Sequence, residues 1–393
     1  MSVLMSWNIQ RFGRNKLLAN QFFDPTSLRE PNIISTIAQS GADLFAVIEV
    51  QTGAGGGFGS LITPPSGVDG VISLLLSLRA NVDPNWQVVP PLILTPNGGY
   101  SEGIAIFFNS NTFQFCGPLA WTGAGTGPIA AGGGGGVPYP TPPWGIALPI
   151  APNILNNTAQ NTLAGQCQFQ NAGAPVFFND NNCRSIWWTQ FLDISANPNR
   201  LLNLFTVHFP PFANQAALAF AQLANVPQIT GPLAANEDRI VWGDFNINAL
   251  NPAAAAVFAH LTGGPVPYTA LINLPTNLRD VRRAATTGVA PYYHYVKGSN
   301  AGGYINLDNI FVARQNPPPG AVNRNIANRT FGGGGFTVDM VRPLFSYFVP
   351  PGTPGYMPPG GARARAFRNP VNFGHIGGKR GVSDHMAVVV TLP

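Results

Sequence analysis

Short apolar runs of the length of buried strands recur along the whole chain, with helix-like segments between some of them. A strand is predicted over 3–9, and a helical pattern over 33–38, closed by Gly41, precedes a second strand over 44–48. The same patterns predict helices over 71–78 and 213–224, and strands over 103–108, 186–192, 202–207, 239–242, 305–312 and 386–392. Because strands outnumber helices and recur in mixed order, the sequence predicts α/β sheets with helices on the outside.

The composition supports a folded chain with long neutral loops. Charged residues make up 9% and hydrophobic residues 45%, so a core can form and the high-charge type of disorder is excluded. The 45 Gly and 38 Pro follow no three-residue period, which excludes collagen. We predict one domain over 1–393, with a core of 1–116, 184–312 and 376–393. The predicted insertions, at about 117–183 and 313–375, carry function or fold back as surface hairpins.

Several classes of protein are disfavoured by motifs that the sequence lacks. No apolar run reaches the roughly 18 residues of a membrane span, and no signal-peptide pattern opens the chain, so cytoplasmic and exported locations both stay open. Cys116, Cys167 and Cys183 form no C-x-x-C clip, so we expect no structural zinc. Cys167 and Cys183 either close a short disulfide or remain isolated thiols. The sequence contains no H-E-x-x-H or P-loop motif.

The basic residues are concentrated late in the chain. Residues 279–393 hold 13 of the 21 Lys and Arg but only 4 of the 16 Asp and Glu, and 18 of the 21 basic residues are Arg. The planar guanidinium grips phosphate oxygens two at a time, so a phosphate-rich partner is favoured. A solvated basic surface is the alternative.

Polar residues sit against the apolar strands, mostly at strand ends. They are Asn8, Glu49, Glu102, His208, Asp244, Asn246, Asp308, Asp384 and His385. Each alone has a structural explanation, such as a cap, a turn former or a hydrogen-bonded core histidine. Structural explanations are less convincing for all of them together, because a buried polar group costs a few kcal/mol unless it is paired. Carboxylates and an amide offer hard oxygen ligands to Mg²⁺ or Mn²⁺, and histidines serve phosphate contact or proton transfer.

The ordered series of motifs resembles the endonuclease/exonuclease/phosphatase superfamily, the deoxyribonuclease I-like fold. The matching motifs are W-N-I at 7–9, I-E-V at 48–50, S-E-G-I-A at 101–105, V-H at 207–208, G-D-F-N at 243–246, L-D-N-I-F-V at 307–312 and S-D-H at 383–385. The resemblance implies a four-layer sandwich of two packed mixed sheets flanked by helices, with the site where strand ends of both sheets meet. It also implies a Mg²⁺- or Mn²⁺-dependent phosphoric ester hydrolase.

The resemblance implies a metal side of the site. Glu49 is expected to be the principal ligand, with Asn8 beside it, Asp384 nearby and Asp308 a further candidate. Carboxylate and amide oxygens of this kind are the ligands that Mg²⁺ prefers.

The resemblance also assigns the groups that act on the phosphate. Asp244 and Asn246 are expected to orient the attacking water and the scissile phosphate. His385 resembles the family's general base or phosphate-polarising histidine, held by Asp308, because a carboxylate on the far ring nitrogen fixes the tautomer. His208 is expected on the phosphate.

Two further positions complete the implied site. Glu102 is expected to hold His208, as in the deoxyribonuclease-like branch. Arg184 precedes a strand where family members often keep an Arg, and we expect it to contact phosphate, although the Pro that follows in the family is absent here.

The substrate is predicted from the late basic cluster, which leads into the S-D-H motif. The cluster consists of Arg363, Arg365, Arg368, Lys379 and Arg380. A polyanion running through the site would meet these residues, so we expect a nuclease with a DNA or RNA substrate, acting as a monomer. The alternative is a lipid or inositol phosphoesterase, with the aromatic segment 345–349 for membrane contact. A non-catalytic binding module is disfavoured because it would not need every acid and base.

Overall fold

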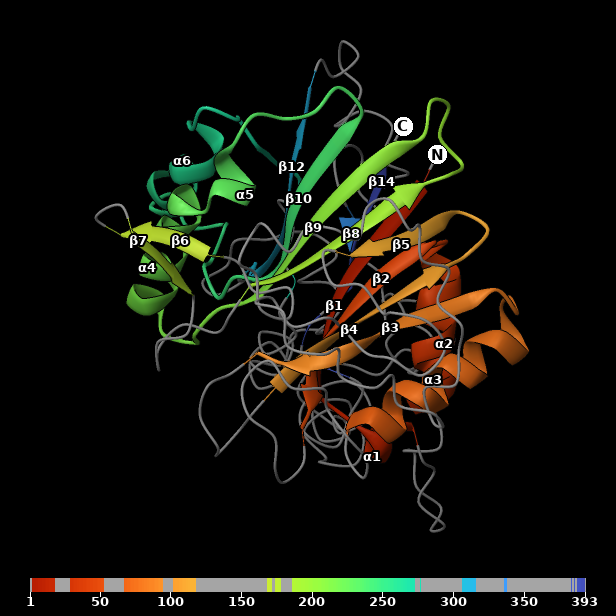
Figure 1. Cartoon of the computed structure of the whole chain (residues 1–393). Coiled ribbons are helices and arrows are strands. Elements are labelled where there is room, and N and C mark those ends of the chain that lie inside the picture. The colour runs from red at the N-terminus through yellow and green to blue at the C-terminus, as the bar shows by residue number, and fades with distance from the viewer. Residues whose placement is uncertain are drawn as a thin grey trace, which may run out of the picture.

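Two six-stranded mixed sheets pack face to face, and helices cover their outer faces (Figure 1). The computed structural model describes residues 2–17, 29–52, 67–94, 102–117, 168–171, 174–177, 186–272, 276, 306–315, 336–337, 383, 385 and 387–392. The predicted fold class is confirmed.

The first sheet has the strand order β13-β14-β1-β2-β4-β3. Its strands are β1 (Ser2–Phe12), β2 (Leu44–Gln51), β3 (Trp86–Ile93), β4 (Glu102–Asn109), β13 (Phe336–Thr337) and β14 (Val388–Leu392). β1 and β2 are parallel, whereas the other neighbours are antiparallel. The carboxyl ends of β1 and β2 therefore lie at one edge of the sheet.

The second sheet has the order β11-β12-β10-β9-β8-β5. Its strands are β5 (Phe113–Gly117), β8 (Trp187–Asp193), β9 (Arg200–His208), β10 (Glu237–Asp244), β11 (Thr269–Ala270) and β12 (Asp308–Arg314). Here β9 and β10 form the parallel pair between antiparallel neighbours, so both sheets share the same central arrangement.

Buried side chains fill the space between the layers. The helices on the side of the first sheet are α1 (Arg14–Leu17), α2 (Arg29–Ser40) and α3 (Gly67–Asn81), and those on the side of the second are α4 (Ala213–Gln222), α5 (Pro227–Thr230) and α6 (Ala254–Thr262). One continuous cluster reaches from α2 and α3 through the first sheet to the second, including Leu4, Phe107 and Leu204. A second cluster, with Phe220 and Phe311, lies between the second sheet and α4 to α6. Each such side chain contributes about 1.5–3 kcal/mol on burial.

The predicted strands and helices are found, with differences in their bounds and several additions. β3 was not predicted because it contains Pro90 and Pro91, which cannot donate to a ladder. The structure places β3 at a sheet edge, where proline is tolerated, and the pairing register shifts between Val89 and Leu92. The last strand of the second sheet, predicted from residue 305, begins only at Asp308.

Short elements also lie inside the two predicted insertions. The hairpin of β6 (Gln168–Asn171) and β7 (Ala174–Phe177) falls in the first, and β13 falls in the second. The division into core and insertions stays a prediction. Cys116 is a buried free thiol, whereas Cys167 and Cys183 lie outside the described residues. No helix within the described ranges is long and apolar enough to cross a membrane.

Candidate active site

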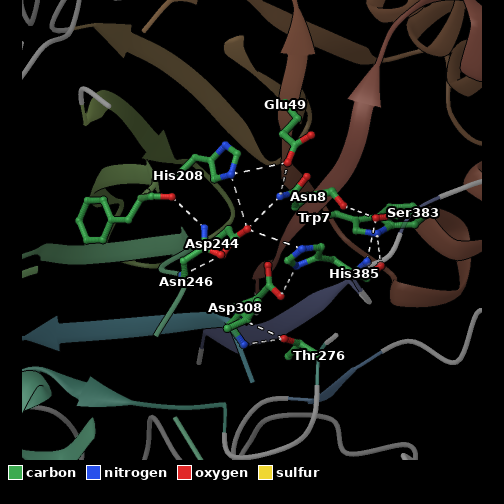
Figure 2. A network of polar contacts seen from close by, with 12 residues as sticks. Trp7, Asn8, Glu49, His208, Asp244, Asn246, Thr276, Asp308, Ser383 and His385 are labelled. Carbon is green, nitrogen blue, oxygen red and sulfur yellow. Dashed lines mark hydrogen bonds and ion pairs between the residues drawn. The ribbon is translucent and has the colours of Figure 1, made fainter. Parts of the chain in front are cut away.

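The carboxyl ends of the two parallel strand pairs face each other and bring eight of the predicted site residues together, all of which except Glu102 are labelled in Figure 2. These are Asn8, Glu49, Glu102, His208, Asp244, Asn246, Asp308 and His385. The other predicted site residues lie outside the described residues, as does Lys379 of the basic cluster. They are Arg184, Arg363, Arg365, Arg368, Arg380 and Asp384.

The carboxylate of Asp244 lies at the centre of the network. Its Oδ2 accepts a hydrogen bond from Asn8 Nδ2 at 2.9 Å and lies 3.6 Å from His208 Nε2 and 3.7 Å from His385 Nε2. Its Oδ1 accepts the backbone N–H of Asn246 at 2.9 Å. One buried carboxylate therefore links the end of β1 to two imidazoles.

Asn8 and Glu49 form the side of the site that fits a metal. Asn8 Nδ2 also donates to Glu49 Oε1 at 3.1 Å, and the backbone N–H of Arg11 donates to Glu49 Oε2 at 3.0 Å. Asn8 is fully buried, and its Oδ1 has no hydrogen-bond partner in the part of the chain that the structure describes. A buried acceptor left unpaired costs about 1–3 kcal/mol. An orphaned amide oxygen beside a carboxylate is a hard-oxygen donor set, which fits Mg²⁺ or Mn²⁺.

Two further groupings of acids and histidines could hold a divalent ion. Glu49, Glu102 and His208 form one, and Asp244, Asp308 and His385 form the other. In each, the ligand atoms lie within 4.8 Å of one another. The site thus holds candidate ligands for a divalent metal, and among the described residues four carboxylates surround two imidazoles.

The backbone of Glu49 is unusual and sets the direction of its side chain. Ile48 pairs with Ile104 and Val50 with Gly103, so Glu49 is an extra residue in β2, a β-bulge. Its φ of 65° lies in the left-handed region, which costs a non-glycine residue about 1–2 kcal/mol. Strain of this kind persists only where surrounding contacts hold it, as the Asn8 and Arg11 donors do here.

His385 is held by Asp308. Its Nδ1 lies 2.8 Å from Asp308 Oδ2, which leaves Nε2 facing Asp244. Burial raises the pKa of Asp308, whereas the charge of His385 and its hydrogen bond oppose the rise. Thr276 supports the acid, because its Oγ1 accepts the backbone N–H groups of Leu307 and Asp308 at 3.0 and 3.2 Å. Sequence reasoning missed Thr276, which belongs to no motif.

His208 is placed in the same way as His385. Its Nδ1 lies 2.9 Å from Glu102 Oε2, and its Nε2 lies 3.6 Å from both Glu49 Oε1 and Asp244 Oδ2. The Glu102 contact is close in distance but outside hydrogen-bond angles, as is common in catalytic contacts without substrate. Each imidazole therefore has an acid at Nδ1 and presents Nε2 to Asp244.

Comparison with known proteins yields structural matches only. No protein-family model matches the chain, and none of the curated proteins matches it. Solved structures of the endonuclease/exonuclease/phosphatase fold match it along its full length. A family protein from Leptotrichia buccalis is 12% identical with a TM-score of 0.44, covering 100% of both chains.

Two other matches carry more specific names. TDP2 of D. rerio, complexed with a single-strand DNA product, is 12% identical with a TM-score of 0.43, covering 99% of this chain and 97% of that one. A mannosyl-6-phosphatase of Bacteroides thetaiotaomicron is 12% identical with a TM-score of 0.43, covering 100% of both. At these identities the likeness concerns the fold alone.

Proposed function

We propose that this chain is a divalent-metal-dependent phosphodiesterase of the superfamily that its motifs resemble, and that its substrate is nucleic acid. The observation that carries the proposal is that two imidazoles, each with an acid at Nδ1, meet at Asp244 beside the unpartnered amide oxygen of Asn8. Such a set of polar groups is expensive to bury and has no role in packing.

The two imidazoles are suited to proton transfer at a phosphate. A carboxylate lies at each Nδ1, and the hydrogen bond with Asp308 fixes the ring of His385, so Nε2 is the atom left to take or give a proton. Asp244 Oδ2 lies within 3.7 Å of both Nε2 atoms, where it can accept a hydrogen bond from an attacking water. Asn246 is tied to this carboxylate through its backbone N–H, so its position follows that of Asp244.

The charge of the site explains why a metal is required. Glu49, Glu102, Asp244 and Asp308 gather around the two imidazoles, so a phosphate anion would be repelled by the carboxylates that surround it. Glu49 and Asn8 would hold a divalent ion, which would supply the opposing charge for the phosphate oxygens.

The late arginine cluster supports nucleic acid as the substrate. It precedes Ser383 and His385 in the sequence without an intervening acid between Arg363 and Arg380, and a polyanion gains from several phosphate contacts at once. The aromatic segment 345–349, on which the lipid or inositol alternative rests, also lies outside the described residues.

The direct test is a panel of substrates given to the purified chain with Mg²⁺ and with EDTA. Plasmid DNA should be cut in Mg²⁺ and left intact in EDTA. Preferential hydrolysis of inositol polyphosphate or sphingomyelin would replace the nuclease by the alternative and keep the phosphoesterase. Hydrolysis of none of the three would contradict the phosphoesterase itself, and undiminished hydrolysis in EDTA would contradict its dependence on a divalent metal.

The role of the arginine cluster has its own test. In the triple variant R363A/R365A/R368A, the salt dependence of DNA binding should flatten by about one log unit for each phosphate that is no longer neutralised. Turnover of bis(p-nitrophenyl) phosphate, which carries a single phosphate, should be unchanged and serves as the control. A triple variant with the parent's salt slope would show that the cluster is solvated surface.

A further inference from the structure

The hydroxyl of Ser383 joins two parts of the site that come from opposite ends of the chain. Ser383 is fully buried, its Oγ donates to the backbone carbonyl of Asn8 at 2.5 Å, and the same Oγ accepts the backbone N–H of His385 at 2.9 Å (Figure 2). A serine hydroxyl has one proton to donate, and here that proton goes to the residue carrying the orphaned amide oxygen.

Trp7 adds a second connection between the same segments. Its side chain is fully buried, and its Nε1–H donates to the backbone carbonyl of His385 at 3.0 Å. The C=O of His385 is thus held by Trp7 of β1, and its N–H is held by Ser383, which in turn donates to Asn8 of β1. The last residue pair of the β1–β14 ladder is Ser6 and Val388. Beyond this pair, side-chain hydrogen bonds connect β1 to the segment of Ser383 and His385.

We infer that Ser383 is a positioning residue that couples the metal side of the site, Asn8 with Glu49, to its histidine side, His385. The inference rests on the proposed function and deepens it. Loss of the hydroxyl would remove a hydrogen-bond partner from the Asn8 carbonyl and from the His385 N–H in a buried place. Both residues then lose a restraint at once, so metal affinity and turnover should fall together.

The chain offers a matched control in Ser40, at the end of α2. Ser40 is also buried, its Oγ donates to the carbonyl of Ile37 at 2.6 Å, and it accepts the N–H of Ala42 at 3.1 Å. Ser40 therefore makes the same two kinds of hydrogen bond as Ser383. It precedes the start of β2, however, whereas Glu49 lies near the other end of that strand. Ser40→Ala therefore measures the structural cost of losing such a hydroxyl.

The experiment compares Ser383→Ala with Ser40→Ala in the full chain. Calorimetry gives the Kd for Mn²⁺, and bis(p-nitrophenyl) phosphate gives kcat and KM. Ser383→Ala should raise the Kd and lower kcat by about 10- to 100-fold each, the usual effect of removing a group that orients a ligand. Ser40→Ala should leave both constants near those of the parent, while urea unfolding shows a loss of stability in both variants. Equal Kd and kcat in the two variants would overturn the inference.

His385→Ala separates coupling from direct action. It should lower kcat, and Ser383→Ala should still raise the Kd for Mn²⁺ in that background. If Ser383→Ala does not fold, Trp7→Phe decides the question. Its control is Trp188→Phe, since Trp188 is buried and donates Nε1–H to Asn203 Oδ1 at 2.9 Å in β8 and β9. Unchanged Kd and kcat in Trp7→Phe would then overturn the coupling.

The outcomes also separate this inference from the proposed function. A parent chain that binds Mn²⁺ but hydrolyses no phosphodiester contradicts the proposed function. The Kd values for Mn²⁺ of Ser383→Ala and Ser40→Ala then test the inference about Ser383 on their own. A parent chain that binds no Mn²⁺ contradicts both.

Discussion

The imidazole of His385 and the carboxylate of Asp308 lie 2.8 Å apart, and both side chains are almost completely buried. Burial raises the pKa of Asp308 above 3.8, and the charge of His385 and its hydrogen bond only partly offset the rise. The folded chain therefore keeps an acid where ionisation is costly, as is common at functional sites.

The raised pKa of Asp308 predicts a pH dependence of stability. Between pH 3.8 and the raised value, the folded state binds this proton more tightly than the unfolded state, so the parent loses stability as pH rises. Asp308→Asn lacks the group. The free energy of unfolding of Asp308→Asn minus that of the parent should therefore increase from pH 3.5 to pH 7. Urea unfolding of both proteins at several pH values measures this difference. A difference that stays constant between these pH values, or that decreases as the pH rises, would refute the prediction.

The left-handed backbone of Glu49 predicts that glycine is the better replacement there. Glu49→Ala and Glu49→Gly both lose the carboxylate, but only glycine relieves the strain at φ 65°. The Gly variant should be more stable by about 1 kcal/mol in urea unfolding, and both should be inactive. An Ala variant as stable as the Gly variant would mean that the bulge relaxes once the side chain is gone.

Gly243 should tolerate no side chain. Its φ is 133°, and a Cβ there would lie 2.1 Å from the carbonyl oxygen of Val207, the residue before His208. Gly243→Ala should therefore displace the end of β9 and cost about 2–4 kcal/mol, with loss of activity. The control is Gly41→Ala, where φ is 66° but a Cβ meets nothing within 4 Å, so only backbone strain is added. Equal losses of unfolding free energy in the two variants would contradict the steric argument.

Much of the fold could be predicted because its signals are local. The apolar runs of β1, β2, β9 and β10 are visible in short windows, and the polar residue that ends each run marks the sheet edge. Features without a local signal were missed. β3 was hidden by its two prolines, and the bulge at Glu49 depends on pairing with β4 rather than on the sequence around it.

The site was predictable for residues at strand ends and not for the groups that support them. Ser383 was recognised only as part of a motif, because its partner Asn8 lies 375 positions away in the sequence. Thr276 stands 32 positions from Asp308 in the sequence, yet its hydroxyl accepts the backbone N–H of Asp308. Such contacts depend on tertiary structure, which no periodicity reveals.

Cys116 is predicted to be an unreactive thiol in the folded chain. Burial raises its pKa to about 11, so at pH 8 only about one molecule in a thousand carries the thiolate that alkylating agents attack. Native protein treated with iodoacetamide should show no label on the Cys116 peptide in mass spectrometry, and the label should appear after urea is added. Rapid native labelling would mean that the edge strand β5 opens readily.

The hydrolysis of bis(p-nitrophenyl) phosphate by the parent chain and by single-site variants tests the proposed phosphodiesterase most directly. Activity should vanish in EDTA and return with Mg²⁺. Glu49→Ala, Asp244→Ala, His208→Ala and His385→Ala should each lose at least about a hundredfold in kcat, because each removes a group that binds metal or moves a proton. Full activity in EDTA, or a His385→Ala variant with the parent's kcat, would contradict the assignment of this site.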